Sequence, residues 1–523
     1  MKIIYSFFLI LCTLTSCKSK HSATAEGFES GDQVVRIASA EEPTSLDPRK
    51  ARDLPTATYL NMLYDGLFRL DFHGNPQPAI AESVQISPDQ KIYTFKLRKT
   101  YWSNGDPLTA GDFVRTWTSI LDPQFPAPNA YQFYVIKGAK AAKEGSSLLS
   151  EIGLSAPDPY TLVVELEAPL SYFQELVSTF FFFPIHSQSS AGNVIANGPF
   201  LLRSWEPRNA FIVVKNPRYW DAHEVRLDGV IVQTLDEHTA LRMFENDELD
   251  WAGSPMGTLP QDSIQTLRRQ QNLQITQGAG THWFRFNTEK PPFNNANMRK
   301  AFNLAINRKA IVEHITQGYQ KPATALVPPA LGLRANAYYA DNDVTGAWVA
   351  FQESLAEQDL SKDDLPSVSL YYGASDRNHK IAQAVQQQWS KALSIQVNLQ
   401  SLEGQLLREK LKTNDYQIAA GSWFADFNDP INFLEIFKFK SNPTNSTGWE
   451  NSTYAELLNK SSSEKDKQKR NSLLEQAEKV LMEHMPVAPL FFSAFNYVKD
   501  ESLLGVYFCD LGYLDFKYAF FGD

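Results

Sequence analysis

Polar and apolar residues alternate strictly along residues 91–98 (KIYTFKLR), which is the period of a half-buried β-strand. Short runs rich in β-branched and aromatic residues predict further strands at 33–38, 200–202, 211–214 and 395–399. Apolar positions at helical spacing predict helices over 58–70, 110–121, 295–312, 378–393 and 461–483. Because strands and helices are mixed along the whole chain, the pattern predicts an α/β or α+β protein.

Two segments carry more specific expectations. The helix predicted over 461–483 is highly charged and has Leu473, Leu474 and Leu481 on one face, so its charges should face solvent. Residues 180–184 (FFFFP) form the most apolar run of the later chain and predict a buried strand. No later stretch has the roughly 20 apolar residues that a membrane-spanning helix needs.

The first residues read as a signal peptide. Lys2 precedes an apolar run over 3–14, and Leu14-Thr15-Ser16-Cys17 has the form of a lipobox. We therefore expect residues 1–16 to be removed, Cys17 to carry lipid, and residues 17–32 to be a flexible linker. The alternative is an ordinary secretory signal with a chance cysteine. The first reading places the mature protein outside the cytoplasm, attached to a cell membrane, on the periplasmic side in a Gram-negative cell.

Length and charge narrow the class of protein. A chain of 523 residues is too long for one hydrophobic core, so at least two domains are expected. A formal net charge of −10 argues against a nucleic-acid surface or a polybasic membrane patch, because both need clustered Lys and Arg. After processing Cys509 is the remaining cysteine, so no internal disulfide is expected.

Catalytic motifs are missing from the sequence. It contains no Gly-x-Ser-x-Gly elbow and no phosphate-binding Gly-Lys-Ser/Thr loop, and Gly278-Ala279-Gly280 lacks the third glycine of a dinucleotide fingerprint. The nine histidines show no metal-ligand spacing. We expect no cofactor and no metal, and a binding protein rather than an enzyme; a hydrolase stays open, because paired carboxylates leave no motif.

Six segments together carry a resemblance. They are residues 44–48 (TSLDP), 95–110 (FKLRK followed by WSNGDPLTA), 197–200 (NGPF), 216–220 (NPRYW), 286–293 (FN with PPF) and 421–430 (GSWFADFNDP). In this order and spacing they resemble the oligopeptide-binding branch of the extracellular solute-binding proteins, family 5, which serve peptide ABC transporters. The resemblance covers about residues 33–500, and the lipobox supports it independently.

The resemblance implies a two-lobed clamp of the periplasmic-binding-protein type, similar to type II, with an extra inserted α/β domain. Lobe I would comprise residues 33–64, 188–281 and 490–523, the inserted domain 65–187, and lobe II 282–489. The chain would cross between lobes near Gly280 and Pro489, and ligand would close the lobes by contacting both. A monomer is expected.

The resemblance also implies a binding site that holds an extended peptide through its backbone. Asp426 would fix the free α-ammonium, Trp423 would lie over the peptide as a flat wall, and the backbones of Phe424, Ala425 and Leu54 would supply hydrogen bonds. Looser matches place five more residues at the ligand: Gly253, Ser254, Asn445, Trp449 and Phe492. The alternatives are that Trp423 belongs to the core, that Asp426 caps a helix starting near Pro430, and that the others are structural.

One departure from the family pattern concerns the far end of the cleft. Ala420 and Gly404 stand where long-peptide receptors can have a basic residue and a second tryptophan. The basic residues that remain open as partners for a ligand carboxylate, each also explained as a solvated surface residue, are Arg377, His379, Arg408 and Lys412. Ligand length and C-terminal preference therefore stay open.

The resulting expectation is a lipid-anchored receptor that delivers short peptides to an ABC permease. Within the same fold, a cell-wall peptide, a nickel complex or haem are the other ligands that the resemblance allows. A protein of another class, an envelope lipoprotein with a structural or adhesive role, would have kept the fold and lost transport.

Overall fold

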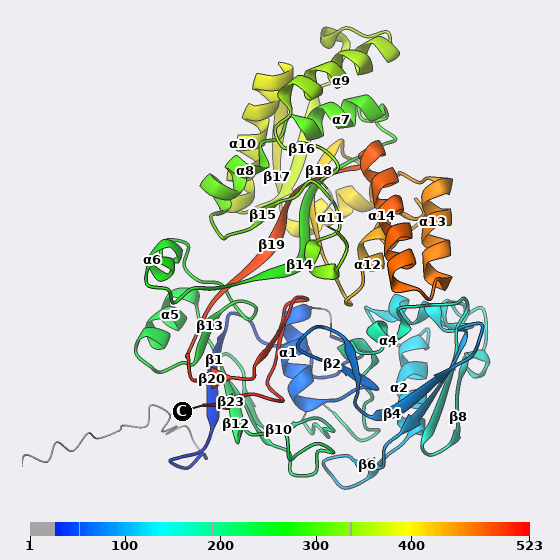
Figure 1. The fold of residues 1–523 in the computed structure, drawn as a ribbon, viewed down its shortest axis with the longest axis vertical. Coiled ribbons are helices and arrows are strands. Elements are labelled where there is room, and N and C mark those ends of the chain that lie inside the picture. Colours follow the sequence, from blue (N-terminus) through cyan, green and yellow to red (C-terminus); the bar gives the residue numbers. More distant parts are fainter. Residues whose placement is uncertain (1–26, 52, 191, 335–336, 523) are drawn as a thin grey trace, which may run out of the picture.

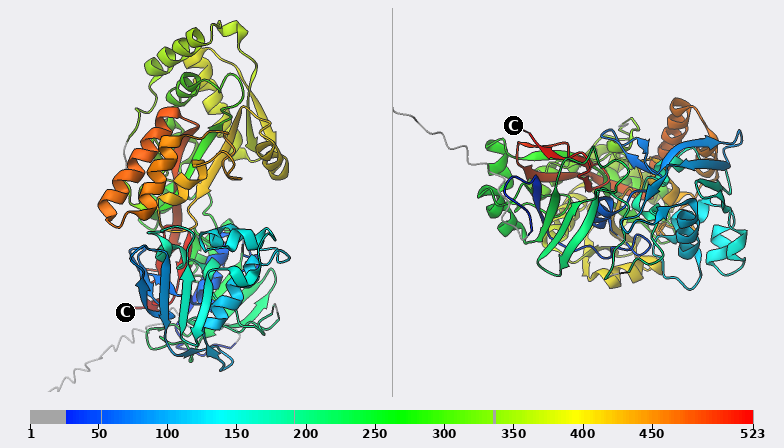
Figure 2. Two further views of the ribbon diagram at one scale, coloured as in Figure 1. Left: turned by 90° about the vertical axis from the view of Figure 1, so that its right-hand side faces the viewer. Right: turned by 90° about the horizontal axis from the view of Figure 1, so that it is seen from below.

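The computed structural model describes residues 27–51, 53–190, 192–334 and 337–522. The predicted signal peptide, Cys17 and most of the predicted linker lie outside the described residues. Two bodies lie one above the other in Figure 1, joined by two long strands, β14 (Gln274–Phe286) and β19 (Val487–Lys499). Figure 2 shows the same division from the side. The chain is thus a two-lobed α/β protein.

One sheet of eleven strands runs through both bodies. In the lower body β1 lies parallel to β12 and β13, and in the upper body β16 lies parallel to β17 and β18. The strands are, across the sheet, β10 (Phe200–Glu206), β11 (Ala210–Lys215), β12 (Gly229–Thr234), β1 (Val34–Ser39), β13 (Trp251–Gly253), β19, β14, β18 (Ile418–Phe424), β16 (Val368–Gly373) and β17 (Val397–Leu402), with β15 (Lys321–Pro322) on β19. The predicted strand pair at 200–202 and 211–214 is present as β10 and β11.

The ladder between β14 and β19 is irregular where the two bodies meet. Regular pairing stops at Gln277 and resumes at Thr281, and a second register shift lies between His282, opposite Phe491, and Trp283, opposite Pro489. A Cβ at Gly280, inside the first interruption, would lie 2.6 Å from the Phe424 ring. These irregularities lie beside both predicted crossings, near Gly280 and Pro489. Rotation of the bodies about them stays a prediction.

The lower body contains the N-terminal strand, the inserted region and the C-terminal tail. Asn197 explains the 197–200 motif, because its side chain accepts the Asp65 N–H and donates to the Asp65 carbonyl. Gly198 follows with no room for a Cβ, which would lie 2.5 Å from the Tyr64 nitrogen. The remaining elements outside the inserted region are α1 (Leu54–Leu63), α5 (Glu237–Glu245), α6 (Ile264–Arg269), β20 (Leu503–Leu504), β21 (Tyr507–Cys509), β22 (Tyr513–Asp515) and β23 (Phe520–Phe521).

The inserted region is built on a four-stranded sheet in the order β4-β5-β9-β8. Its helix α2 has the bounds that the sequence predicts, and Asp112 accepts the Thr109 N–H at 2.8 Å at its start. The elements are β2 (Phe68–Leu70), β3 (Pro76–Pro78), β4 (Ala81–Ile86), β5 (Ile92–Leu97), β6 (Thr100–Tyr101), β7 (Pro107–Leu108), α2 (Ala110–Leu121), η1 (Ala130–Val135), α3 (Ala139–Lys143), η2 (Leu149–Glu151), β8 (Leu154–Asp158), β9 (Thr161–Glu165), α4 (Phe173–Leu176) and η3 (Phe180–Phe182).

The phenylalanine run is buried, but the predicted strand is wrong. Residues Phe180–Phe182 form a turn of 3-10 helix, closed by the Phe183 N–H on the Phe180 carbonyl at 3.2 Å. A 3-10 turn spreads consecutive rings around its axis, whereas a strand would divide them between two faces. Phe182 consequently stacks on Phe133 at 4.1 Å and meets Trp117 edge-on at 5.3 Å.

Helices cover the upper part of the sheet, and α13 and α14 stand above α4 of the inserted region in Figure 1. Backbone contacts join the two, with the Ser171 N–H on the Ser462 carbonyl at 3.1 Å. The upper elements besides the strands are α7 (Ala296–Leu304), α8 (Arg308–Ile311), η4 (Val312–Thr316), η5 (Pro329–Leu331), α9 (Val344–Glu357), η6 (Lys362–Asp364), α10 (Asp376–Leu393), α11 (Gly404–Lys412), α12 (Ile431–Leu434), η7 (Glu435–Phe437), α13 (Ser452–Ser463) and α14 (Lys467–His484).

Two predicted helices are divided in the structure. The helix predicted over 295–312 breaks after Leu304, because Asn307 starts α8 by accepting the Ala310 N–H at 2.8 Å. The one predicted over 461–483 is α14 preceded by the end of α13, and Asp466 caps α14. A third, predicted over 58–70, ends at Leu63, and Phe68–Leu70 form β2 instead.

Two charged residues of α14 do not face solvent, which corrects the expectation for this helix. Arg470 binds Asp429 through both terminal nitrogens, at 2.6 and 2.8 Å, and both side chains are buried. Buried Glu478 accepts the N–H groups of Leu326 and Val327 at 2.8 and 2.7 Å. These contacts fix α14 against the rest of the upper body.

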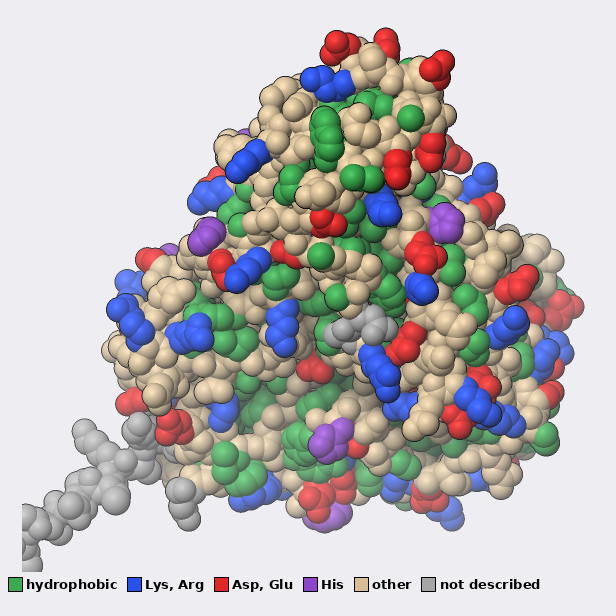
Figure 3. Space-filling model, turned by 45° about the horizontal axis from the view of Figure 1, so that its top comes forward, with side chains coloured by type: hydrophobic (Ala, Val, Ile, Leu, Met, Phe, Trp, Pro, Cys, Tyr) green, Lys and Arg blue, Asp and Glu red, His purple; other side chains and the backbone are tan. Residues whose placement is uncertain are grey.

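The surface agrees with the composition. Figure 3 shows Lys and Arg interspersed with Asp and Glu over the face that it presents, without a broad field of one sign. In the part of the chain that the structure describes, no helix combines the length and the apolarity needed to cross a membrane.

Candidate functional site

A cavity of about 130 Å³ lies between the inserted region and the upper body. From the inserted region it is lined by Tyr131, Gln132, Val135, Tyr172 and Leu176; from the upper body by Trp423, Asp426, Phe427, Asn432, Glu435, Ile436, Asn442 and Thr444. It therefore contains two of the residues that the sequence places at a ligand, Asp426 and Trp423, and joins them to a part of the chain nearly 300 residues earlier.

Asp426 reaches across this cavity to the inserted region. It follows the end of β18, and its Oδ2 accepts hydrogen bonds from the Tyr131 hydroxyl at 3.0 Å and from Gln132 Nε2 at 2.9 Å. Its own N–H donates to Asn432 Oδ1 at 3.1 Å. The carboxylate that accepts a backbone N–H at the start of α12 is that of Asp429, which binds the Ile431 N–H at 2.9 Å.

The electrostatics of Asp426 are those of a carboxylate without a cation. Burial raises its pKa above the ordinary value of 3.8, and the hydrogen bonds from Tyr131, Asn432 and Gln132 oppose that rise. Within the described ranges, no Lys, Arg or His nitrogen forms an ion pair with it. A cation that entered the cavity would stabilise the ionised form of the carboxylate. Its attraction to the carboxylate would be stronger there than in bulk water, because the effective dielectric constant is lower.

Trp423 stands beside Asp426 on the same side of the cavity. Its indole Nε1 donates to Asn432 Oδ1 at 2.8 Å, so one amide oxygen orients both Trp423 and the Asp426 backbone. The ring is partly exposed. This arrangement fixes the plane of the indole as a wall of the cavity, although part of the ring also packs on the core.

The next two residues approach the interruption in the long ladder. Phe424 lies opposite Gly280 and meets the His282 ring edge-on at 6.1 Å. The Ala425 N–H donates to the Ala279 carbonyl at 2.9 Å, and the Ala425 side chain is buried. The N–H of Ala425 is thus already used within the protein, which leaves its carbonyl as the group that could face a ligand.

On the lower body, Gly253 and Ser254 are not among the residues that line the 130 Å³ cavity, and the structure describes Leu54 only by its backbone. Leu54 is the first residue of α1, after the N-cap Asp53. Gly253 ends β13 with φ +96°, where its Cβ position lies 2.7 Å from the Asn496 carbonyl oxygen. Ser254 donates its N–H to that same carbonyl at 2.9 Å. Ser254 lines a different cavity of about 280 Å³, to which Arg377 and Asn496 also contribute.

The three remaining predicted residues are buried, and each has hydrogen bonds or packing contacts within the protein. Asn445 donates to the carbonyls of Phe439 and Trp449 at 3.1 and 2.8 Å and organises the loop after α12. Trp449 meets Tyr454 edge-on at 5.2 Å. Phe492 packs with Ala323 and Ala325. The structure does not bring these three to the cavity of Asp426, and their role at a ligand stays a prediction.

Comparison with known proteins now decides the family. The family model of the bacterial extracellular solute-binding proteins, family 5 (middle region), matches residues 75–445. The chain belongs to this family. The oligopeptide-binding protein OppA of Bacillus subtilis (strain 168) is 40% identical over 507 residues, covering 94% of this chain and 93% of the relative.

Solved structures of family members agree in fold. The unliganded open form of MppA, a periplasmic murein tripeptide-binding protein, matches with a TM-score of 0.80 and 27% identity over 94% of this chain and 98% of the other. Listeria monocytogenes OppA bound to peptide matches with a TM-score of 0.74 and 27% identity, over 94% and 100%. The two-lobed fold of this solute-binding protein is therefore that of its family.

Sequence reasoning missed the residues that the inserted region contributes to the site of this solute-binding protein. Tyr131 and Gln132 lie in η1, and Tyr172 stacks on Phe427 with ring centroids 5.3 Å apart and an angle of 3°. No local pattern marks them, because a partly exposed tyrosine in a short turn is ordinary. Only the approach of the inserted region to the end of β18 gives them a shared cavity with Asp426.

The four basic residues left open for a ligand carboxylate lie on α10 and α11, outside the cavity of Asp426. Arg377 is 5.6 Å from the Phe491 ring centroid, and His379 Nδ1 shares a hydrogen bond of 2.7 Å with the Tyr372 hydroxyl. Arg408 and Lys412 are exposed on α11. The geometry gives none of these a place beside Trp423.

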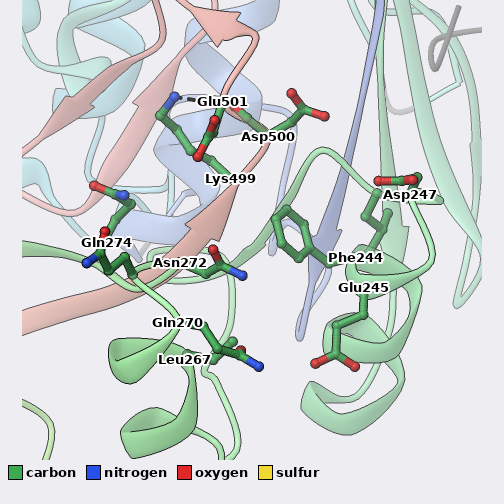
Figure 4. A pocket seen from close by; sticks show the side chains of 12 residues that line it. Phe244, Glu245, Asp247, Leu267, Gln270, Asn272, Gln274, Lys499, Asp500 and Glu501 are labelled. Carbon is green, nitrogen blue, oxygen red and sulfur yellow. Dashed lines mark hydrogen bonds between the residues drawn. The ribbon is translucent and has the colours of Figure 1, made fainter.

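A larger cavity, of about 580 Å³, lies on the far side of the lower body between α5, α6 and the end of β19 (Figure 4). Its lining is mostly polar, with Gln270, Asn272 and Gln274 opposite Phe244. Lys499 turns from it to donate to the Leu503 carbonyl at 2.9 Å. It contains none of the residues that the family resemblance places at a ligand.

Proposed function

We propose that this solute-binding protein captures short peptides outside the cytoplasm through their backbone and free N-terminus, and delivers them to an ABC permease. The observation that carries the proposal is Asp426, a half-buried carboxylate without a cation partner among the described residues, facing a cavity between two parts of the chain. The peptide-bound state of the Listeria relative and the oligopeptide-binding name of the B. subtilis relative support the ligand class.

In this proposal the α-ammonium of the peptide enters beside Asp426 and adds a charged hydrogen bond to those from Tyr131 and Gln132. Trp423 covers the first residues of the peptide. Backbone groups of the protein then pair with the extended main chain, so that side chains of many kinds are accepted. The protein's role ends with binding and release, without a chemical step.

We propose that the two lobes close on the peptide as rigid bodies, with the lobe boundaries that the family resemblance implies. Residues 282–489 would move as one lobe against residues 33–64, 188–281 and 490–523, with 65–187 as the inserted domain. Peptide contacts on both sides favour the closed state in proportion to the extra contacts it gains there. We further propose a monomer that is held at the membrane by lipid on Cys17, with residues 17–32 as the linker.

The direct test is a calorimetric titration of the purified protein with a tripeptide and, separately, with the N-acetylated form of the same tripeptide. Acetylation removes the positive charge and should weaken binding at least tenfold, because a charged hydrogen bond contributes about 1.5–3 kcal/mol. A peptide of reversed sequence with a free amine serves as the control and should bind like the parent. Equal affinities for the free and acetylated forms would remove Asp426 from this role.

The pH dependence of binding provides a second test. Only the ionised carboxylate attracts an ammonium, and burial has raised the pKa of Asp426. Affinity should therefore fall as the pH is lowered through this raised pKa, with a midpoint above 3.8, and recover as the pH is raised again. Glu435 lines the same cavity and its pKa is also raised by burial, so an Asp426→Asn variant is needed to separate the two. A flat profile for Asp426→Asn is the expected control.

A cell-wall peptide is a second candidate ligand, favoured by the TM-score of 0.80 with a murein tripeptide-binding protein. Competition between a murein tripeptide and an ordinary tripeptide distinguishes the two. A preference of more than tenfold for the murein tripeptide would assign the protein to that ligand class, and equal competition would assign it to general peptide uptake.

A further inference from the structure

Arg285 is a half-buried arginine to which neither the sequence motifs nor the proposed function gives a role. It lies on β14 opposite Ala419 of β18, and its guanidinium crosses toward Gly421, where any Cβ would collide with it. The guanidinium carbon is 6.0 Å from the centroid of the Trp283 ring. Arg285 therefore extends along the sheet toward the end of β18 that carries Trp423.

The guanidinium of Arg285 lacks the aspartate partner that three buried arginines of the described chain have. Its Nε is inaccessible to water and without a hydrogen-bond partner, and no carboxylate pairs with it in the described part of the chain. By contrast, Arg69, Arg308 and Arg470 each bind an aspartate. Burial lowers the pKa of Arg285, and only the nearby Tyr416 opposes this. A half-buried guanidinium that is left without a counter-ion is costly unless an anion reaches it.

Arg285 lies on the same face of the sheet as the residues of the binding site. Directly opposite residues of an antiparallel pair share a face, and so do alternate residues of one strand. Trp283 lies opposite Gly421 and Thr281 opposite Trp423, so Arg285, Gly421 and Trp423 share one face. Trp423 lines the 130 Å³ cavity that contains Asp426. Gly421, which lies between Arg285 and Trp423, has no side chain on this face, so the Arg285 guanidinium can extend over its backbone.

We propose that Arg285 binds a carboxylate of the peptide ligand, either its C-terminal carboxylate or an acidic side chain. The inference rests on the proposed function and adds a second charged anchor to it, opposite in sign to Asp426. A guanidinium holds a carboxylate through two parallel hydrogen bonds, which fixes its direction as well as its charge. Arg285 would thus take the role that the sequence leaves without a residue at Ala420.

The spacing of the two anchors limits the ligand. Asp426 comes five positions after Gly421 in the sequence, which corresponds to at most about 17 Å of extended chain at roughly 3.4 Å per residue. A peptide that reaches both anchors in an extended form then has no more than about five residues. The inference therefore assigns the second anchor to short peptides.

The experiment measures binding of four tripeptides to the full protein: a free acid, its C-terminal amide, and a pair with Glu or Gln at the second position. The wild type should prefer the acid over the amide, or Glu over Gln, by at least tenfold. Arg285→Gln should reduce that preference below twofold while leaving the affinity for the neutral member of the pair unchanged. Loss of the acid preference assigns Arg285 to the C-terminus, and loss of the Glu preference assigns it to a side chain.

Two further variants control the result. Arg377→Gln changes an arginine that lines the separate 280 Å³ cavity and should leave both preferences intact. Arg285→Lys keeps the charge but not the paired hydrogen bonds and should retain an intermediate preference, which also serves if Arg285→Gln is poorly folded. A wild type without either preference, or an Arg285→Gln variant that keeps both, overturns the inference. If those peptides still bind and acetylation still weakens them, the proposed function stands without it; if no peptide binds, both fail.

Discussion

Replacing Asp426 with Asn is expected to weaken the binding of a free tripeptide about ten- to hundredfold, with little change in the stability of the free protein. The amide has the shape of the carboxylate and keeps an oxygen for the Tyr131 hydroxyl and Gln132 Nε2. It lacks the charge that attracts an ammonium, and a hydrogen bond to a charged group contributes about 1.5–3 kcal/mol. Isothermal titration at pH 7 with the same tripeptide measures the change.

The N-acetylated tripeptide separates a charge effect from a change of shape. In a double-mutant cycle the loss caused by Asp426→Asn and the loss caused by acetylation should not add, because both remove the same interaction. The variant and the wild type should bind the acetylated peptide equally. If Asp426→Asn weakens the free and the acetylated peptide by the same factor, Asp426 supports the cavity wall and does not contact the ammonium.

Replacing Arg69 with Met should lower the free energy of unfolding by about 3–5 kcal/mol, which is the cost of leaving buried carboxylates unpaired. Arg69 binds Asp515 at 2.6 and 2.8 Å, and its Nη1 reaches Asp65 at 3.3 Å. Arg69 and both aspartates are buried. The arginine thereby ties the C-terminal tail to the start of the inserted region. Denaturant unfolding followed by tryptophan fluorescence measures the loss.

Lys137→Met is the matched control for this stability experiment. Lys137 pairs with Glu165 at 2.7 Å, but the side chains are 52% and 42% exposed. An exposed pair of this kind contributes about 0–1 kcal/mol. A double change, Arg69→Met with Asp515→Leu, should recover part of the stability, because it removes one of the stranded charges. If Arg69→Met and Lys137→Met unfold at the same midpoint concentration of denaturant, the Arg69 network makes no net contribution to the free energy of unfolding.

The patterns that were predicted well are local ones. Helix α2 has the predicted bounds of 110–121 because its Thr109 start signal and its apolar spacing both lie within the segment. The alternating strand at 91–98 is β5, Ile92–Leu97, for the same reason. Helix α10, Asp376–Leu393, begins two residues earlier than expected, at the Ser375 cap. Periodicity and capping are properties of neighbouring residues, so these elements were accessible from sequence.

The errors arise where distant residues decide the local structure. Apolarity alone predicts burial of Phe180–Phe182 but not a turn, which depends on the positions of Trp117 and Phe133. The charges of Arg470 and Glu478 predict a solvated helix face, but Asp429 and the Leu326 and Val327 amides bury them. A charge pattern does not show which partners the fold supplies.

The sequence by itself determined that this is a large two-lobed α/β protein of the solute-binding type, and it identified Asp426 and Trp423 as candidate ligand residues. Both conclusions were accessible because the family motifs consist of contiguous residues. The tertiary structure decided what surrounds them. Tyr131 and Gln132 meet Asp426 only because the inserted region folds against the end of β18. Arg285 comes to lie over Gly421 only through the pairing of β14 with β18. Contacts between strands and domains depend on register and packing across hundreds of residues, and a local pattern does not encode them.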